Sequence, residues 1–415
     1  MNRLLIVAFI FLRLAPLKGQ ESSYEFSFTG NEDQITVPFN YTQGFIILKV
    51  ILNGQHKLNL ILDTGAENII LFKYEALEKY KLSVSKEIQL IGSDLEKIVD
   101  AVICRTNTLR LEEGVAINND LVVLKEDILA LDQITGERID GILGARSFWA
   151  QTIALDYIKQ ELTIFKKSAR LNHKSDIKYQ KYPLQIRGHK PYLNMEYKDH
   201  NGEAKPIEVL LDTGSALGLL LFNHADSTFQ LPPKHIRASL GKGISGDILG
   251  YIGRLPRIEF SDTHFFNNII GYFQEIDEEL NPDIYSRRLG LIGNPILSRF
   301  DVIIDYLDGN LYLKANKQFN KKFKHDLSGL QIFATGSNLN EFVVSNVFES
   351  SPAKEAGFQK GDVIRRIGLF GPSLLSLGSI NNKLSRREGK NVRIVIKRDG
   401  KKIVKRLKLK DYLSK

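Results

Sequence analysis

The tripeptide Asp-Thr-Gly occurs twice in the sequence, at residues 63–65 and 212–214, each time directly after an apolar run. The two copies lie 149 positions apart. A second landmark, an apolar pair followed by glycine, recurs with the same offset at residues 142–144 and 291–293. Two landmarks with one common spacing indicate an internal duplication. We therefore expect residues 35–314 to form two similar units.

The segments around both motifs have the composition of β-strands. They are short, rich in Ile, Leu and Val, and separated by turn residues; examples are residues 45–52, 58–62, 68–72, 98–110 and 153–165. Helical candidates are few and short, at residues 74–80, 145–150 and 295–300. Short strands at this spacing favour a barrel or sandwich over alternating strands and helices. We predict a mainly β protein with two pseudo-symmetric lobes, residues 21–170 and 171–314.

Both aspartates are expected to lie in apolar surroundings. The residues before Asp63 are Leu60, Ile61 and Leu62, and neither motif loop contains a Lys or Arg to neutralise a carboxylate. Burying an unpaired carboxylate costs several kcal/mol. If the duplication brings Asp63 next to Asp212, repulsion at about 3 Å prevents both from being ionised. The pair would share one proton, and could then activate a water while protonating a carbonyl oxygen.

The doubled motif resembles the active-site signatures of aspartic proteases of the pepsin and retropepsin class. The resemblance extends over about residues 35–314. It implies two lobes built as β-barrels, with Asp63 and Asp212 as the catalytic dyad. It also implies that the rest of each motif supports the dyad, the threonines by hydrogen bonds between the loops and the glycines by close approach of their amides. These supporting residues are Thr64, Gly65, Thr213, Gly214 and Ser215.

The residue that follows the motif differs between the two copies, being Ala66 in the first and Ser215 in the second. A serine hydroxyl can donate a hydrogen bond to an ionised carboxylate and lower its pKa, whereas alanine cannot. We therefore expect an asymmetric dyad, with a less acidic optimum than in a protease with hydroxyls at both positions.

A cleft of this kind needs a flexible cover that excludes water and holds an extended polypeptide substrate. The glycine-rich residues 240–246 can bend between two strands, and residues 91–94 lie at the equivalent place in the first copy. An ordinary hairpin turn is the alternative for both segments. The flap candidates are Gly92, Gly241, Gly243, Ile244 and Gly246.

Residues 315–328 have the polar, basic composition of a linker, and a different pattern follows them. It opens with Gly329, Leu330, Gln331 and Ile332 and continues with an apolar strand and a Gly-Asp-Val-Ile string. This order resembles the PDZ domains of exported bacterial proteases. The resemblance implies an α+β domain over residues 329–410, whose opening loop would bind the C-terminal carboxylate of a peptide. Gln331 replaces the usual second glycine, and a packing module without a ligand is the alternative.

The net charge of +9 is concentrated at the C-terminus. Residues 386–415 contain 13 Lys or Arg and 3 acidic residues, so the remaining chain is close to neutral. A solvated β-hairpin with its turn at Asp399 and Gly400 accounts for this segment. We expect no nucleic-acid partner, and contact of the basic tail with a membrane surface is the weaker alternative.

The N-terminus has the pattern of a cleaved export signal: a positive start, nine apolar residues at 4–12, and a small-residue exit by residue 20. We therefore expect an exported protein, located in the periplasm, in the cell envelope or outside the cell. The single cysteine, Cys104, excludes an intramolecular disulfide. The histidines form no metal-binding motif, and we predict neither a metal nor a cofactor.

These observations predict an exported aspartic endopeptidase that hydrolyses peptide bonds through Asp63, Asp212 and an activated water, with a PDZ domain for peptides or partners. The alternative is a non-catalytic peptide-binding protein that keeps the protease shell for recognition. A third interpretation is an envelope scaffold held by the basic tail. Intact Asp and Gly in both motifs favour catalysis, because a binding shell requires neither carboxylate.

Overall fold

The computed structural model describes residues 25–28, 32–91, 98–111, 115–149, 151–166, 179–223, 230–243, 246–275, 290–323, 325–371 and 374–413. Its regular structure is almost entirely strand, so the prediction of a mainly β chain is confirmed. The predicted leader, residues 1–20, and the flap candidates Gly92 and Ile244 lie outside the described residues. No helix within these ranges is long and apolar enough to cross a bilayer.

Eleven strands come from the first repeat. They are β1 (Glu25–Phe28), β2 (Gln34–Thr42), β3 (Phe45–Leu52), β4 (His56–Asp63), β5 (Ile69–Leu71), β6 (Val84–Ile91), β7 (Ile98–Leu111), β8 (Val115–Leu124), β9 (Gly141–Gly144), β10 (Thr152–Asp156) and β11 (Glu161–Phe165). Three short helical turns accompany them: α1 (Ala76–Lys79), α2 (Leu131–Thr135) and the 3-10 turn η1 (Ala145–Phe148). The sequence predicted α1 and η1 but not α2.

The second repeat forms β12 (Gln180–Arg187), β13 (Lys190–Lys198), β14 (Ala204–Asp212), β15 (Leu219–Asn223), β16 (His235–Gly243), β17 (Gly246–Glu259), β18 (Phe265–Glu275), β19 (Gly290–Gly293), β20 (Phe300–Asp305) and β21 (Asn310–Ala315), with α4 (Asn294–Leu297). Its pairings repeat those of the first lobe. Strand β4 pairs in parallel with β9, as β14 does with β19. Likewise β5 pairs in parallel with β8, as β15 does with β18.

A sheet of six strands, in the order β2-β11-β10-β20-β21-β12, joins the two lobes. Its central pair is β10 with β20, one strand from each repeat, and Ala154 lies opposite Ile303. These two residues are separated by the repeat offset of 149, so the pseudo-twofold axis passes between them. One buried hydrophobic cluster extends across both lobes, from Ile153 and Leu155 to Val302 and Ile304.

The segment predicted as a linker, residues 315–328, begins as part of the second lobe. The Arg299 guanidinium donates hydrogen bonds to the carbonyl oxygens of Gln318 and Phe319, at 2.9 and 3.1 Å, and to that of Lys321. It also stacks on the ring of Phe323, with Cζ 3.6 Å from the ring centroid. Apolar contacts of the partly buried Phe319 and Phe323 therefore attach this polar segment to the lobe.

The C-terminal domain is an antiparallel sheet in the order β22-β23-β24-β25-β26 with two helices and a core of its own. The elements are β22 (Leu330–Thr335), β23 (Glu341–Val347), α5 (Pro352–Glu355), β24 (Val363–Ile367), α6 (Leu377–Leu384), β25 (Asn391–Arg398) and β26 (Lys401–Lys408). As predicted, the basic tail forms a hairpin, β25–β26, that turns at Asp399 and Gly400 with φ of 47° and 78°.

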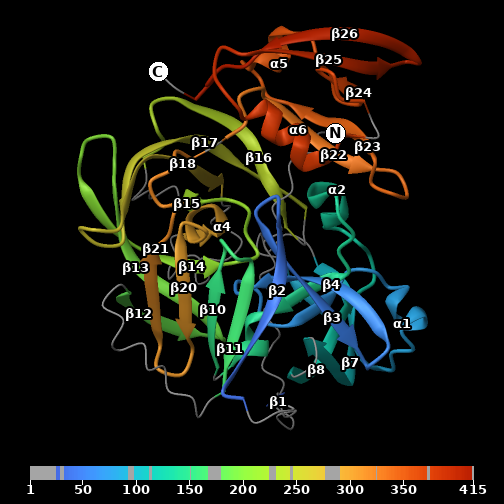
Figure 1. Ribbon diagram of the computed structural model, residues 1–415, viewed down its shortest axis with the longest axis vertical. Coiled ribbons are helices and arrows are strands. Elements are labelled where there is room, and N and C mark those ends of the chain that lie inside the picture. The colour runs from blue at the N-terminus through green and yellow to red at the C-terminus, as the bar shows by residue number, and fades with distance from the viewer. Residues whose placement is uncertain are drawn as a thin grey trace.

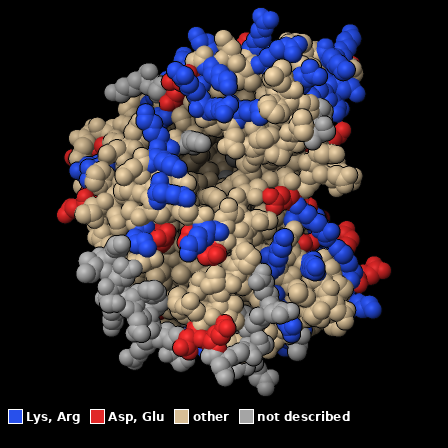
Figure 2. Space-filling model, in the orientation of Figure 1, with Lys and Arg blue, Asp and Glu red and all other residues tan. Residues whose placement is uncertain are grey.

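This domain packs on both lobes (Figure 1). Phe348, Tyr412 and Leu413 share a buried cluster with residues of β16 and β17 in the second lobe. Nearby, Arg254 Nη2 lies 2.6 Å from Asp411 Oδ2. Figure 2 shows Lys and Arg side chains gathered on this domain, and the surface hollowed below it.

Candidate active site

The two Asp-Thr-Gly motifs begin where β4 and β14 end. In the first lobe Asp63 lies opposite Gly144 of β9, and in the second lobe Asp212 lies opposite Gly293 of β19. The apolar-apolar-glycine landmarks are therefore the strands that flank the aspartates.

A glycine is required at the end of each flanking strand. A Cβ added to Gly144 would lie 2.4 Å from the carbonyl oxygen of Asn68, and one added to Gly293 would lie 2.2 Å from that of Leu217. Real Cβ atoms do not approach a backbone oxygen so closely. The motif loop and the flanking strand can pack together because these positions have no side chain.

The two threonines connect the loops symmetrically. Thr64 N donates to Thr213 Oγ1 and Thr213 N donates to Thr64 Oγ1, both at 3.0 Å. Each hydroxyl then donates across the axis, Thr64 to the Leu211 carbonyl oxygen at 2.6 Å and Thr213 to that of Leu62 at 2.8 Å. All four groups are buried, so the hydrogen bonds fix the relative position of the two aspartates.

The loops bring the two aspartates together at the junction of the lobes. A Cβ added to Gly65 would lie 2.6 Å from Cγ of Asp212, and one added to Gly214 would lie 2.3 Å from Cγ of Asp63. Each motif glycine thus packs directly on the carboxyl group of the other lobe. Both aspartates are only 2% exposed.

Backbone amides orient both carboxyl groups. Asp63 Oδ1 accepts hydrogen bonds from the amides of Gly65 and Ala66, both at 2.8 Å. Asp212 Oδ1 accepts one from the amide of Gly214, also at 2.8 Å. The glycines therefore serve twice, as hydrogen-bond donors to their own aspartate and as a surface for the other one.

Burial raises the pKa of Asp63 well above its ordinary value, and the charge of Asp212 raises it further. The amides of Ala66 and Gly65 and the charge of Lys190 lower it by smaller amounts. Desolvation and like-charge repulsion act in the same direction here, so this carboxyl group retains a proton at a pH where an exposed aspartate is ionised.

Ser215 is fully buried after the second motif. Its hydroxyl donates to the carbonyl oxygen of Leu217 at 3.4 Å and accepts from the amide of Leu217 at 3.2 Å. The main chain of Ser215 accepts a hydrogen bond from the amide of Asn294 at 3.0 Å. These contacts hold the loop in place and connect it to α4.

Asn294 is a site residue that the sequence analysis missed. It is completely buried, and its Nδ2 donates to the carbonyl oxygens of Thr213 and Gly44 at 2.5 and 2.7 Å. Its Oδ1 accepts a hydrogen bond of 2.6 Å from the Tyr157 hydroxyl. One side chain therefore connects the second motif loop to two segments of the first lobe. The available signal was its position, directly after Gly293, where the first repeat has Ala145.

Tyr306 is the repeat counterpart of Tyr157, but its hydroxyl is buried without a hydrogen-bond partner among the described residues. Burial raises its pKa, and the charge of Asp63 contributes to the increase. The two equivalent tyrosines therefore differ in their hydrogen bonding, since Tyr157 donates to Asn294 and Tyr306 does not.

The described flap candidates lie on the β16–β17 hairpin. Gly241 follows a register shift in the ladder, and Gly243 pairs with Gly246 next to the tip. The equivalent hairpin of the first lobe is β6–β7. Its pairing runs from Val84 opposite Cys104 to Ile91 opposite Ile98. The role of these glycines as a flap stays a prediction.

In the C-terminal domain, Gly329 directly precedes β22, and Leu330, Gln331 and Ile332 are the first three residues of that strand. Two amides of the loop are hydrogen-bonded within the domain, that of Gly329 to Asp326 Oδ2 and that of Leu330 to Ser328 Oγ. Burial raises the pKa of Asp326 to about 6. Gln331, at the position of the usual second glycine, is 3% exposed.

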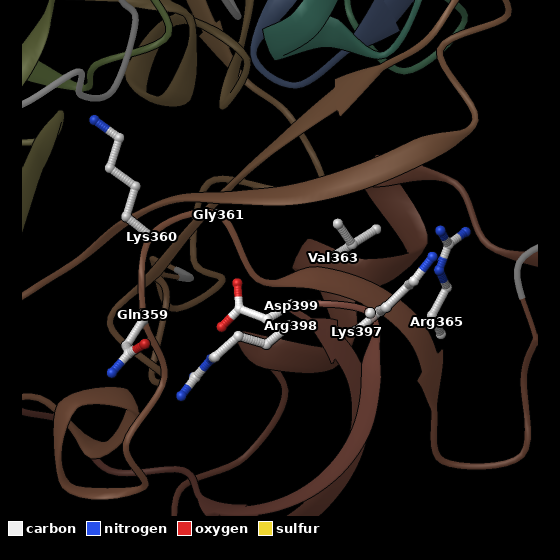
Figure 3. A pocket seen from close by; sticks show the side chains of 9 residues that line it. Gln359, Lys360, Gly361, Val363, Arg365, Lys397, Arg398 and Asp399 are labelled. Carbon is white, nitrogen blue, oxygen red and sulfur yellow. The ribbon is translucent and has the colours of Figure 1, made fainter.

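The described residues of this domain also line a cavity of about 340 Å³, and neither Asp63 nor Asp212 is among its lining residues. Figure 3 shows Arg365 and Lys397 along one side of it and Gln359 and Lys360 on another. Within the described ranges, no group of three His, Cys, Asp or Glu side chains is placed to hold a metal ion.

Residues 48–146 match the family model described as aspartyl protease, and residues 321–409 match the one described as PDZ domain. Among solved structures, the chain is similar to the aspartic proteinase from Irpex lacteus, with 12% sequence identity and a TM-score of 0.40. The match covers 70% of this chain and 99% of that one. No curated protein matches the chain. This mainly β chain therefore carries an aspartyl-protease-like domain followed by a PDZ domain.

Proposed function

We propose that the chain is an aspartic endopeptidase in which Asp63 and Asp212 are the catalytic dyad. The observation that supports this most is the contact of each motif glycine with the carboxyl group of the other lobe, which leaves two buried aspartates side by side with no cation in either loop. Residues 1–20 resemble a leader, and we include export in the proposal.

The carboxyl pair titrates as a unit and holds one proton over a range of pH. With the proton on Asp63, the ionised Asp212 takes a proton from a water whose oxygen attacks the carbonyl carbon of the scissile bond. Asp63 donates its proton to the carbonyl oxygen in the same step. Asp212 then gives its proton to the leaving nitrogen while Asp63 takes one from a hydroxyl of the tetrahedral intermediate. The C–N bond breaks to give an acid and an amine, and the pair returns to its starting state.

Digestion of a mixed peptide library between pH 3 and pH 7, followed by mass spectrometry, tests this function. We expect cleavage that Asp63→Asn and Asp212→Asn each reduce by about 10²- to 10⁴-fold, the usual contribution of a general acid or base. The matched control is Asp262→Asn, because Asp262 is exposed on the surface. Pepstatin should inhibit the wild type and the control.

Equal cleavage by all four proteins would contradict the proposal, because the activity would not depend on the dyad. Peptide binding without cleavage by the wild type would favour the non-catalytic peptide-binding protein. Circular dichroism of each variant verifies that it is folded.

A further inference from the structure

Strand β22 and helix α6 of the C-terminal domain lie side by side, and we call the space between them the groove. Strand β22 is at the edge of its sheet, and among the described strands it pairs only with β23. Helix α6 packs beside it. An exposed strand edge next to a helix is where a PDZ domain receives a peptide as an added strand.

A segment of the first lobe lies in this groove. Gly136, which ends α2 with a φ of 71°, is located between the two walls. A Cβ built on Gly136 would be 3.8 Å from Cβ of Ala334 in β22 and 3.2 Å from Cβ of Leu377 in α6. In Figure 1, α2 lies directly below β22 and α6.

Apolar contacts hold the same segment against β22. Phe333 of β22 packs on the cluster of the first lobe that contains Leu129 and Leu131. Leu377 and Ala334, which face Gly136, are 2% and 0% exposed. Both residues also belong to the core of the C-terminal domain, and Gly136 occupies the space in front of them.

A hydrogen bond also connects α6 to the first lobe close to the two aspartates. Asn381 Nδ2 of α6 donates to Gln43 Oε1 at 3.0 Å. Gln43 precedes Gly44, and a Cβ on Gly44 would lie 2.9 Å from Cβ of Ala216, which follows the second motif. Only one turn of chain thus separates the helix of the PDZ groove from the loop that carries Asp212.

We propose that residues 130–136 are an internal ligand of the PDZ domain, and that an extended peptide binds the groove between β22 and α6 only after this segment has left. The occupant is an internal segment with no chain end. This agrees with a carboxylate loop in which the amides of Gly329 and Leu330 are already hydrogen-bonded within the domain. Occupancy by the internal segment and by a peptide is mutually exclusive, whether or not the chain is a protease.

A disulfide trap tests the occupancy directly. The Cβ separation of 3.8 Å between positions 136 and 334 suits a disulfide, so the Gly136→Cys, Ala334→Cys double variant should cross-link under mild oxidation. The control is Gly54→Cys with Ala334→Cys, because Gly54 has a φ of 72° and open space around it. The natural Cys104 is buried. Equal cross-linking of the two pairs, or none in the first, would overturn the proposal.

Peptide binding tests the exclusion. The double variant of the first test, Gly136→Cys with Ala334→Cys, holds the segment in the groove when it is oxidised and frees it when it is reduced. The control pair Gly54→Cys with Ala334→Cys is treated in the same way. Fluorescence anisotropy with a labelled pool of randomised dodecapeptides, with free and with amidated C-termini, should show about tenfold weaker apparent binding to the oxidised double variant than to the same protein after reduction, and no such difference for the control pair. Identical binding by the oxidised and the reduced double variant, or no binding by either, would contradict the exclusion.

Discussion

Burial of Asp63 has a cost that depends on pH. Its carboxyl group is 2% exposed and lies next to a second carboxyl group, and both conditions disfavour the ionised form. The folded-state pKa is therefore above the unfolded-state value of about 3.9. Between these two values the folded chain binds more protons than the unfolded chain, so the free energy of unfolding falls as pH rises through this range.

Asp63→Asn removes that loss of stability, since the amide has no charge to bury. We expect the variant to have a higher melting temperature than the wild type at pH 7 and nearly the same one at pH 3, where the wild-type carboxyl is protonated in both states. Differential scanning calorimetry at both pH values measures the difference. Asp262→Asn, at an exposed position, should show no such trend. A difference that is independent of pH would be inconsistent with the raised pKa.

The two equivalent tyrosines should respond differently to loss of their hydroxyls. Tyr157→Phe leaves the buried Oδ1 of Asn294 without its donor and should cost about 1–3 kcal/mol. Tyr306→Phe removes a buried hydroxyl that has no partner among the described residues, and should be neutral or stabilising. Urea denaturation gives both free energies. Equal losses in the two variants would show that the hydrogen bond to Asn294 is not what distinguishes them.

At the scale of single residues, the sequence predicted what the duplication makes visible. Asp63, Thr64 and Gly65 have counterparts with the same identity in the second copy, and a repeat of that kind is found by comparing the chain with itself. Asn294 was missed because its counterpart in the first copy is an alanine, so comparing the chain with itself does not reveal it. Its importance comes from three contacts between segments that are distant in the sequence.

Among the elements, β9 and β19 are short strands whose position depends on close backbone packing. Gly144→Ala would place a methyl group 2.4 Å from the carbonyl oxygen of Asn68, so that β9 or the motif loop must move. We expect a loss of about 3 kcal/mol in the free energy of unfolding, measured by urea denaturation. Gly371→Ala is the control, since a Cβ there would meet nothing within 4 Å. Similar losses in both variants would contradict the packing argument.

The strands could be predicted from the sequence, but their order in the sheet and helix α2 could not. The short apolar segments indicated strands correctly, because each buried strand has its own local pattern. The six-strand sheet between the lobes could not be derived in the same way, since β10 pairs with β20 across about 149 residues of chain. Helix α2 has five residues, too few for a helical periodicity, and its partner is a different domain.

The whole molecule is held together by two kinds of interface. The lobes share a continuous sheet and a common hydrophobic cluster, so neither has a complete core alone. The C-terminal domain has its own core and is attached through side chains, at α2 in the first lobe and at β16 and β17 in the second. The sequence predicted the domain but not this attachment. An apolar residue at an interface, such as Leu413, is of the same type as an apolar residue in a core, so the sequence does not distinguish the two.

Attachment of the C-terminal domain should make the chain unfold in one calorimetric transition. Leu413 is 4% exposed in the cluster shared with β16 and β17, and Leu413→Ala should cost about 2–5 kcal/mol of interface stability. Because the domain has its own core, the variant should show two transitions, one for each part of the chain. Leu369→Ala is the same substitution at a side chain that is 94% exposed, and it should retain the single transition. If Leu413→Ala also retained a single transition at an unchanged temperature, the contact with the second lobe would contribute nothing to the cooperativity of the whole chain.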